Sequence, residues 1–258
     1  MKYPHTIKYI FLLLSVVSSL RANAQYTTLN AHSHNDYEQR VPFWAAYNAR
    51  FGSVEADVFA VDGELYVAHY KGGIKKDRTL DALYIEPLAL RFKQNRNVVW
   101  PHFDGKLQLL IDLKTPPTPT LDLLVAKLSK YPEVFDRSVN PNAVQVIISG
   151  DMPKPNDFGK YPAFIKFDGR RDITYSPEQL ERVAMYSLTW NTFAKGKTRD
   201  ALYKEAEEVV KMVHELNKKI RFYAIEDTPE AWQLMIDLGV DFINTDKITE
   251  LADFLEKK

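Results

Sequence analysis

The chain has 258 residues, with 34 lysines and arginines against 34 aspartates and glutamates, and it has no cysteine. The absence of cysteine excludes disulfide bonds and thiolate metal sites. The balanced charge argues against a general nucleic-acid-binding protein, which needs a basic surface.

The first 24 residues have the pattern of a secretory signal peptide. A basic start with Lys2 and Lys8 is followed by an apolar run over residues 9–17 and by the A-x-A cleavage site Ala22-Asn23-Ala24. The apolar run is shorter than the roughly 20 residues that a membrane-spanning helix needs. We therefore expect cleavage near Ala24, rather than an uncleaved anchor, and a periplasmic or secreted protein.

The mature chain, residues 25–258, would be slightly acidic. Cleavage removes Lys2, Lys8 and Arg21 and leaves 31 basic residues against 34 acidic ones, a formal charge of −3. The remaining 234 residues suit one α/β barrel of about 250 residues. No linker or low-complexity run divides them, so we predict one domain.

Eight apolar runs predict strands, and amphipathic segments between most of them predict helices. The expected strands cover residues 26–32, 53–58, 107–113, 144–148, 163–167, 184–190, 220–225 and 241–244. The expected helices cover residues 42–51, 79–92, 120–131, 176–183, 199–218, 229–238 and 248–256.

Two local signals refine this pattern. Asp62-Gly63 predicts a hairpin turn that extends the second strand into a small ribbon ending at His69. Pro87 predicts a kink or a break in the helix over residues 79–92. Strands that alternate with helices favour parallel pairing, and eight repeats favour a closed (β/α)8 TIM barrel over an open sheet.

Carboxylates gather where the second and third strands end. Glu55 and Asp57 are two residues apart on one strand, so they share a face, and Asp112 ends the next core strand. Carboxylates on one face repel each other unless a cation lies between them, and oxygen ligands suit Ca²⁺ or Mg²⁺. The alternative is pairing of these acids with nearby lysine or arginine.

Histidines flank this acidic pair. His32 and His34 end the first strand, and His69 ends the ribbon. Imidazole titrates near neutral pH, so one histidine can accept a proton while another donates one. Barrel enzymes place their chemistry at strand ends, which favours a catalytic role here over a structural one.

A cation and several later side chains complete the expected site. Lys114 lies two residues after Asp112 and could neutralise an anionic substrate oxygen. Trp190 and Tyr223 end later strands and are expected to shape the substrate pocket, as are Asp168 and Arg170; aromatic residues in such runs also serve as core.

The order His, Glu-x-Asp, His, acid-x-Lys resembles that of the PLC-like phosphodiesterase superfamily. Its members include glycerophosphodiester phosphodiesterases, phosphatidylinositol-specific phospholipases C and sphingomyelinase D enzymes. The similarity runs over residues 32–114 and resumes over residues 220–247, where RFYAIED and LGVDFINTD are similar to the glycerophosphodiesterase ending. HSHNDY and VEADV look closest to the branch that includes the fungal altered inheritance of mitochondria proteins.

This resemblance implies a TIM barrel with one divalent metal. It implies that Glu55, Asp57 and Asp112 are metal ligands and that His69 is the second catalytic histidine. Asp112-Leu113-Lys114-Thr115 is similar to the sphingomyelinase D string, in which the acid binds metal and the lysine contacts the phosphate.

Two alignments give different residues as the first catalytic histidine. Ser33-His34-Asn35 looks like the phospholipase C string, which makes His34 catalytic and Asn35 a metal ligand. Alignment on the glycerophosphodiesterase His-Arg-Gly selects His32 instead. The chain lacks that arginine, for which Arg40 is a candidate replacement, and it lacks the following Pro-Glu-Asn-Thr and the insertion domain of many glycerophosphodiesterases.

We therefore expect an exported, metal-dependent phosphodiesterase for a glycerophosphodiester or phospholipid headgroup. Water or a neighbouring substrate hydroxyl would attack, and the second route would give a cyclic phosphate. A lipid substrate would bring the protein into peripheral contact with a membrane.

Two other classes stay open. One is an amidohydrolase-type site on His32-x-His34, although His102 and His214 are poorly placed as further ligands. The other is a non-catalytic periplasmic binding protein on the same barrel.

Overall fold

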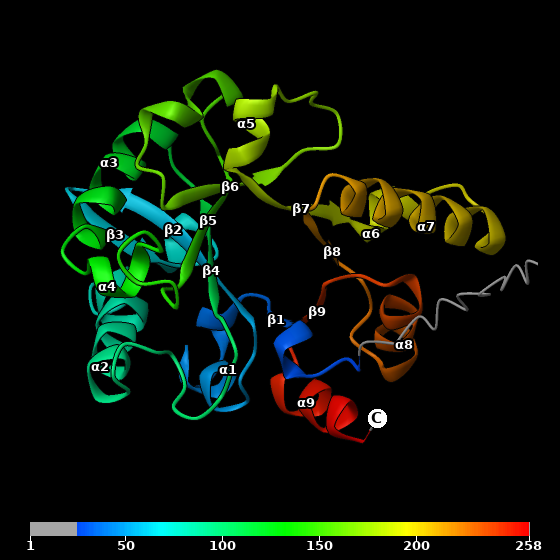
Figure 1. The fold of residues 1–258 in the computed structure, drawn as a ribbon, viewed down its shortest axis with the longest axis horizontal. Coiled ribbons are helices and arrows are strands. Elements are labelled where there is room, and N and C mark those ends of the chain that lie inside the picture. The colour runs from blue at the N-terminus through cyan, green and yellow to red at the C-terminus, as the bar shows by residue number, and fades with distance from the viewer. Residues whose placement is uncertain (1–24, 258) are drawn as a thin grey trace, which may run out of the picture.

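The computed structural model describes residues 25–257 (Figure 1). The predicted signal peptide, residues 1–24, lies outside them. Within the described range, no helix combines the length and the apolar character needed to cross a membrane.

The described chain forms a closed barrel of eight parallel strands. The strands follow one another in chain order around the barrel, and β1 pairs with both β9 and β2, which closes it. The parallel strands are β1 (Ala31–Ser33), β2 (Ser53–Val61), β4 (Gln108–Leu113), β5 (Gln145–Gly150), β6 (Ile165–Gly169), β7 (Val183–Thr189), β8 (Lys219–Tyr223) and β9 (Phe242–Thr245).

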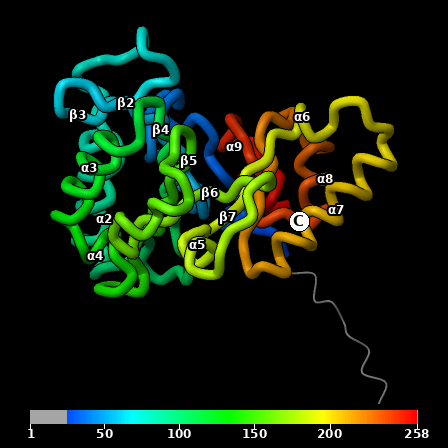
Figure 2. The backbone as a smooth tube through the Cα atoms, turned by 90° about the horizontal axis from the view of Figure 1, so that it is seen from above, coloured from blue at the N-terminus to red at the C-terminus, as the bar shows by residue number. Residues whose placement is uncertain are grey.

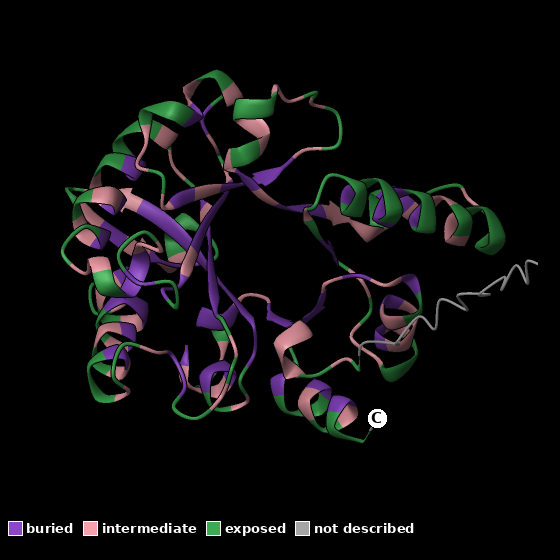
Figure 3. Cartoon of the chain, viewed as in Figure 1, coloured by how far each residue is buried: buried purple, intermediate pink, exposed green. Residues whose placement is uncertain are grey.

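Helices lie outside the strands, as Figures 1 and 2 show from two directions, with α2, α3 and α4 on one side and α7 and α8 on the other. The α-helices are α1 (Trp44–Asn48), α2 (Glu86–Gln94), α3 (Pro117–Leu128), α4 (Pro132–Phe135), α5 (Pro177–Arg182), α6 (Trp190–Ala194), α7 (Arg199–Glu215), α8 (Pro229–Leu238) and α9 (Ile248–Glu256). Their buried stripes face the strands and their exposed stripes face outward (Figure 3). The predicted TIM barrel is thus the observed fold of the described residues.

The two local predictions are also confirmed. β2 continues to Val61, turns at Asp62-Gly63 and pairs antiparallel with β3 (Glu64–Val67). The helix expected over residues 79–92 divides into a π-helical turn, η4 (Asp81–Ile85), and α2, whose first turn contains Pro87. Proline is tolerated there because the first turn does not need its N–H.

Some boundaries differ from the prediction. The first strand is shorter than expected because Thr28–Asn30 forms a 3-10 turn capped by the Thr27 side chain. Trp190 starts α6 instead of ending a strand. A 3-10 helix, η5 (Pro155–Lys160), connects β5 to β6 where no helix was expected.

The barrel interior holds both an apolar and a polar group beneath its charged end. Leu110, Ile147, Met185 and Phe242 form a small buried cluster of their own. Beside them, Ser53 Oγ contacts His32 and accepts a hydrogen bond from Gln108. Residues two apart on a strand share a face, so Asp112 points inward one step further along β4 than Leu110. The fold therefore directs charged side chains toward the carboxyl ends of the strands.

Candidate active site

A cavity of about 470 Å³ opens at the carboxyl ends of the strands. Its walls come from β2, β4, β5, β6, β7 and β8 and from loops, among them those that follow β1 and β3. It is lined by His34, Asn35, Glu55, Asp57, His69, Asp112, Leu113, Lys114, Ser149, Gly150, Asp168, Arg170, Ser187, Arg221 and Tyr223. This is the end of a barrel at which active sites form.

Three carboxylates meet in this cavity. Glu55, Asp57 and Asp112 each offer an oxygen, and these oxygens all lie within 4.8 Å of one another. The register explains the meeting, because Asp57 pairs with Asp112 across β2 and β4. Such a group can hold a divalent cation that prefers oxygen ligands.

Glu55 is buried against two partners. Its Oε2 lies 2.7 Å from His32 Nε2 and accepts a hydrogen bond from Arg221 Nη1 at 2.7 Å. Burial alone would raise the pKa of Glu55, but the Arg221 guanidinium and His32 hold that pKa well below its usual range. Glu55 is thus fixed in place and ionised.

Asp57 and Asp112 share a lysine. Lys114 Nζ lies 3.0 Å from Asp57 Oδ2 and 2.9 Å from Asp112 Oδ1. The approach to Asp57 has poor hydrogen-bond geometry, and neither buried Asp57 oxygen accepts a well-aligned hydrogen bond from residues 25–257. Burial raises the pKa of Asp57 to about 6 in spite of the opposing charge of Lys114. The carboxylate therefore retains capacity for a further cation.

His34 is held by an acid from the far end of the chain. Its Nδ1 lies 2.8 Å from Asp246 Oδ1, in the loop after β9. Burial works against protonation, but the hydrogen bond to Asp246 and the negative charges of Glu55 and Asp246 outweigh it and raise the pKa of His34. Asp246 is itself fixed by Asp227, whose Oδ2 accepts a hydrogen bond from the Asp246 backbone N–H at 2.7 Å.

His69 lies on another wall of the cavity, with its side chain 58% exposed. Its Nδ1 is 3.0 Å from the Tyr37 hydroxyl and 3.4 Å from Asp57 Oδ2. The Tyr37 hydroxyl donates to Asn35 Oδ1 at 2.8 Å. A short chain of polar contacts therefore connects the loop after β1 with His69.

The structure separates the two candidates for the first histidine. His34 lines the cavity. His32 is fully buried beneath it, with Nδ1 2.6 Å from Ser53 Oγ and Nε2 at Glu55. Burial, together with the neighbouring charge of Arg221, lowers the pKa of His32 to about 3. Both ring nitrogens of His32 are engaged, so an amidohydrolase-type pair with His34 has no free ligand there.

Two candidate substrate residues lie outside the cavity. Arg40 is exposed on the loop before α1, so it does not replace the missing arginine of the family motif. Trp190 packs edge-on against Phe222 at a centroid distance of 5.1 Å and does not line the cavity. Tyr223 and Lys114 do line it, as do Asp168 and Arg170.

Several cavity residues were not singled out in the sequence. Arg221, Ser149 and Ser187 lie on inward faces of β8, β5 and β7. Asp246, which follows β9 and contacts His34 without lining the cavity, was not singled out either. Arg221 lies two residues before Tyr223 on β8, so the two side chains share one face of the strand. That spacing was the one signal in the sequence that could have placed Arg221 in the site.

Gly150 makes room for the acidic group. It has a positive φ of 72°, and a Cβ at this position would lie 2.2 Å from Asp112 Oδ1 and 2.5 Å from the Leu113 carbonyl oxygen. Glycine is therefore required both by the backbone conformation and by the position of Asp112.

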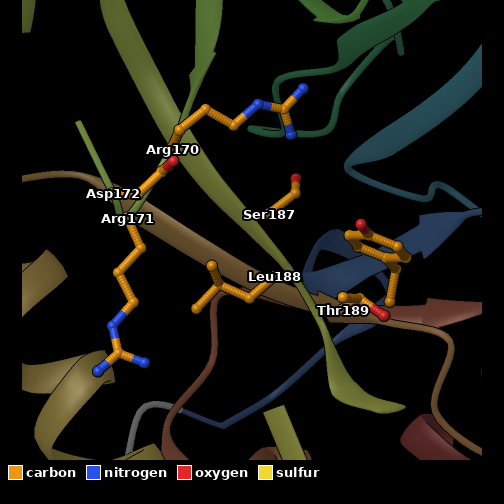
Figure 4. A pocket seen from close by; sticks show the side chains of 7 residues that line it. Arg170, Arg171, Asp172, Ser187, Leu188 and Thr189 are labelled. Carbon is orange, nitrogen blue, oxygen red and sulfur yellow. The ribbon is translucent and has the colours of Figure 1, made fainter. Parts of the chain in front are cut away.

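A second cavity of about 390 Å³ adjoins the first and shares Arg170, Ser187 and Tyr223 with it. Figure 4 shows Ser187 and Leu188 on its wall, with the side chains of Arg170 and Arg171 extending in different directions. Arg171 Nη1 forms an ion pair with Glu205 Oε1 at 3.2 Å.

Comparison with known families places the chain among phosphodiesterases. The model of the AIM6-like phosphodiesterase domain matches residues 21–154, just over half of the 258 residues. The model of the glycerophosphoryl diester phosphodiesterase family matches residues 219–249. Among curated proteins, the altered inheritance of mitochondria protein 6 homolog of Arthroderma benhamiae is 25% identical over 84% of this chain and 81% of its own length. Altered inheritance of mitochondria protein 6 of Lachancea thermotolerans is 27% identical over 92% of this chain and 68% of its own length.

Solved structures share the barrel. Crystal structures of glycerophosphodiester phosphodiesterases from Parabacteroides distasonis and Agrobacterium tumefaciens each superpose with a TM-score of 0.54, at 18% and 16% identity. Each superposition includes 88% of this chain. It includes 95% of the Parabacteroides distasonis chain and 98% of the Agrobacterium tumefaciens chain. At this identity the likeness shows the fold.

Gly150→Ala should cost more stability than Gly63→Ala. Both glycines have positive φ, 72° and 79°, so each alanine costs about 1–2 kcal/mol of backbone strain. A Cβ at Gly63 meets nothing within 4 Å, whereas one at Gly150 strikes Asp112 and adds about 1–3 kcal/mol of overpacking. Urea unfolding of both variants measures the difference in stability. Equal losses would contradict the close packing of Gly150 against Asp112.

Asp246→Asn should lower the pKa of His34, because it removes the charge that raises it. The raised pKa stabilises the folded protein below the ordinary histidine value of 6.5, and this stabilisation disappears as pH rises through the folded pKa. Asp246→Asn should therefore be less stable than the parent near about pH 5 and equal to it near about pH 9.

NMR titration of His34 and urea unfolding at both pH values check this expectation. Asp253→Asn, an exposed substitution on α9, is the control and should leave the His34 titration unchanged. An unshifted His34 pKa in Asp246→Asn would show that the 2.8 Å contact does not control protonation.

Proposed function

Because the chain belongs to the AIM6-like phosphodiesterase domain family, we propose that it is an exported phosphodiesterase that requires one divalent cation and uses two histidines. The observation that carries this proposal is the convergence of Glu55, Asp57 and Asp112 within 4.8 Å, in a cavity that also holds His34 and His69. Acids, imidazoles and a lysine at strand ends are the groups that cleavage of a phosphodiester needs.

The three carboxylates fit a hard cation such as Ca²⁺ or Mg²⁺. Asp57 supports this fit most directly, since its two buried oxygens accept no well-aligned hydrogen bond from the described residues. Glu55, Asp57 and Asp112 would hold the cation, with Asn35, at the cavity wall, as a further oxygen ligand. When bound, the cation would polarise the phosphoryl group and lower the pKa of the attacking hydroxyl.

The two histidines divide the proton transfers. His34, whose pKa is raised beside Asp246, keeps its proton to higher pH than an ordinary histidine and would protonate the leaving alkoxide. His69, exposed beside Asp57, would accept the proton of the attacking hydroxyl. That hydroxyl belongs to water, or to the substrate itself if a cyclic phosphate forms. Each transfer by a positioned imidazole contributes about 10²–10⁴-fold to the rate.

Lys114 and the adjoining cavity would bind the substrate. Lys114 Nζ lies at the acid cluster and would offset negative charge on the phosphoryl oxygens. The second cavity begins at Ser187 and Tyr223, which border the first, so it would take one substituent of the diester. Tyr223 lines both spaces and would contact that substituent. Glycerophosphodiesters and phospholipid headgroups are the substrate classes proposed, with a lipid substrate bringing the protein to a membrane surface.

Export is proposed from the signal-peptide pattern of residues 1–24. Mass spectrometry of the protein purified from its source tests this part separately. A mature N-terminus near Gln25 supports export, and a retained Met1 opposes it.

Hydrolysis of a phosphodiester panel should be lost in EDTA and restored by Ca²⁺ or Mg²⁺. His34→Asn and His69→Asn should each lower kcat by about 10²–10⁴-fold, because each removes one proton transfer. Glu55→Gln should abolish the restoration by metal, because it removes a ligand charge.

The matched control for the histidine variants is His102→Asn. His102 is exposed, lies outside the cavity and has a φ of 55°, which asparagine adopts readily. This variant should retain the parent rate. Activity that survives in EDTA and in both His34→Asn and His69→Asn would overturn the proposed function.

A further inference from the structure

Arg221 is a buried cation that reaches into the cavity from β8. Only 3% of the residue is exposed, yet it forms part of the cavity wall. Three acceptors on three other strands hold it: Nε donates to Ser187 Oγ at 2.9 Å, and Nη1 donates to Glu55 Oε2 at 2.7 Å and to Asn244 Oδ1 at 3.0 Å. Nη1 also contacts His32 Nε2.

These contacts leave one amino group of the guanidinium unused. A guanidinium carries five N–H donors in a fixed fork. In Arg221 the contacts involve Nε and Nη1, and Nη2 donates to no residue within 25–257. Nη2 is not among the buried side-chain atoms that lack a partner, so it is accessible from the cavity whose wall Arg221 forms. A ligand oxygen in the cavity can therefore accept a charge-assisted hydrogen bond from Nη2.

The other cations of the cavity differ from Arg221 in their contacts or their burial. Lys114 Nζ contacts Asp57 and Asp112, and Arg170 Nη2 donates to the Gly150 carbonyl at 3.2 Å. Arg221 is the more buried of the two arginines, so its charge is less screened by water. A planar guanidinium matches the oxygens of a phosphoryl group better than an ammonium does.

We propose that Arg221 is a catalytic residue that binds a non-bridging phosphoryl oxygen through Nη2 while Nη1 holds Glu55. This assignment rests on the proposed phosphodiesterase function. It gives the chain the arginine that its His-Ser-His string lacks and that Arg40 does not supply. It also couples substrate charge to the acid cluster, since one guanidinium contacts both. The site would thereby favour anionic diesters over neutral triesters.

Titration calorimetry with inorganic phosphate tests the assignment without requiring turnover. The full mature chain would be titrated with Mg²⁺ present and again in EDTA. Loss of a charge-assisted hydrogen bond should weaken phosphate binding by about tenfold to a hundredfold in Arg221→Gln under both conditions. Arg221→Lys keeps the charge near Glu55 and should show a smaller loss.

The matched control is Arg199→Gln. Arg199 is exposed at the start of α7 and lines neither cavity. This variant should bind phosphate as tightly as the parent. An equal loss in Arg199→Gln and Arg221→Gln would overturn the assignment, because it would reflect general surface charge.

A purely structural role for Arg221 gives a different result. If Arg221 only held Glu55, Arg221→Gln would weaken Mg²⁺ binding but bind phosphate normally in EDTA, and the assignment would fail. If Arg221→Gln does not fold, Arg221→Lys carries the test, and its unchanged phosphate affinity would overturn the assignment. A parent protein that binds phosphate through Arg221 but cleaves no diester would overturn the proposed function and the catalytic role, and it would leave only the phosphate contact of Arg221 standing.

Discussion

Electrostatic repulsion among three carboxylates is the constraint on which this structure depends. Glu55, Asp57 and Asp112 bring negative charge to within 4.8 Å inside a largely buried space. Two cations of the chain offset this negative charge. Arg221 contacts Glu55, and Lys114 contacts both Asp57 and Asp112. Asp57 nevertheless retains oxygens without well-aligned donors. The acid cluster is thus held together by the protein and still has room for a further positive charge.

The barrel explains how distant residues reach this cluster. Parallel strands end at one rim, so side chains from β1 to β9 converge there although they are far apart in sequence. Asp227 accepts hydrogen bonds from Thr245 and from the backbone of Asp246, which positions Asp246 against His34. The first and last strands are neighbours, and this closure places the acid from the end of the chain beside the histidine from its beginning. The pairing that closes the barrel therefore also brings together the two ends of the chain that form the candidate site.

Local spacing was enough to predict much of the fold and part of the cluster. Apolar runs located the eight strands, and the two-residue spacing of Glu55 and Asp57 put both on one face. The same rule could not separate His32 from His34, because both face inward, and depth inside a closed barrel decides which one reaches the cavity. Arg221 was missed because its partner Glu55 lies 166 positions away. Such long-range pairs follow from barrel closure, which a strand pattern does not encode.

Metal uptake by the acid cluster is the claim on which the rest of the account depends. Electron paramagnetic resonance of free Mn²⁺, added to chelator-treated protein, counts the ions that the chain removes from solution. The account predicts one Mn²⁺ per chain, with at least a tenfold weaker uptake in Asp57→Asn, where one ligand charge is lost. No uptake by the parent protein, or equal uptake by Asp57→Asn, would contradict it.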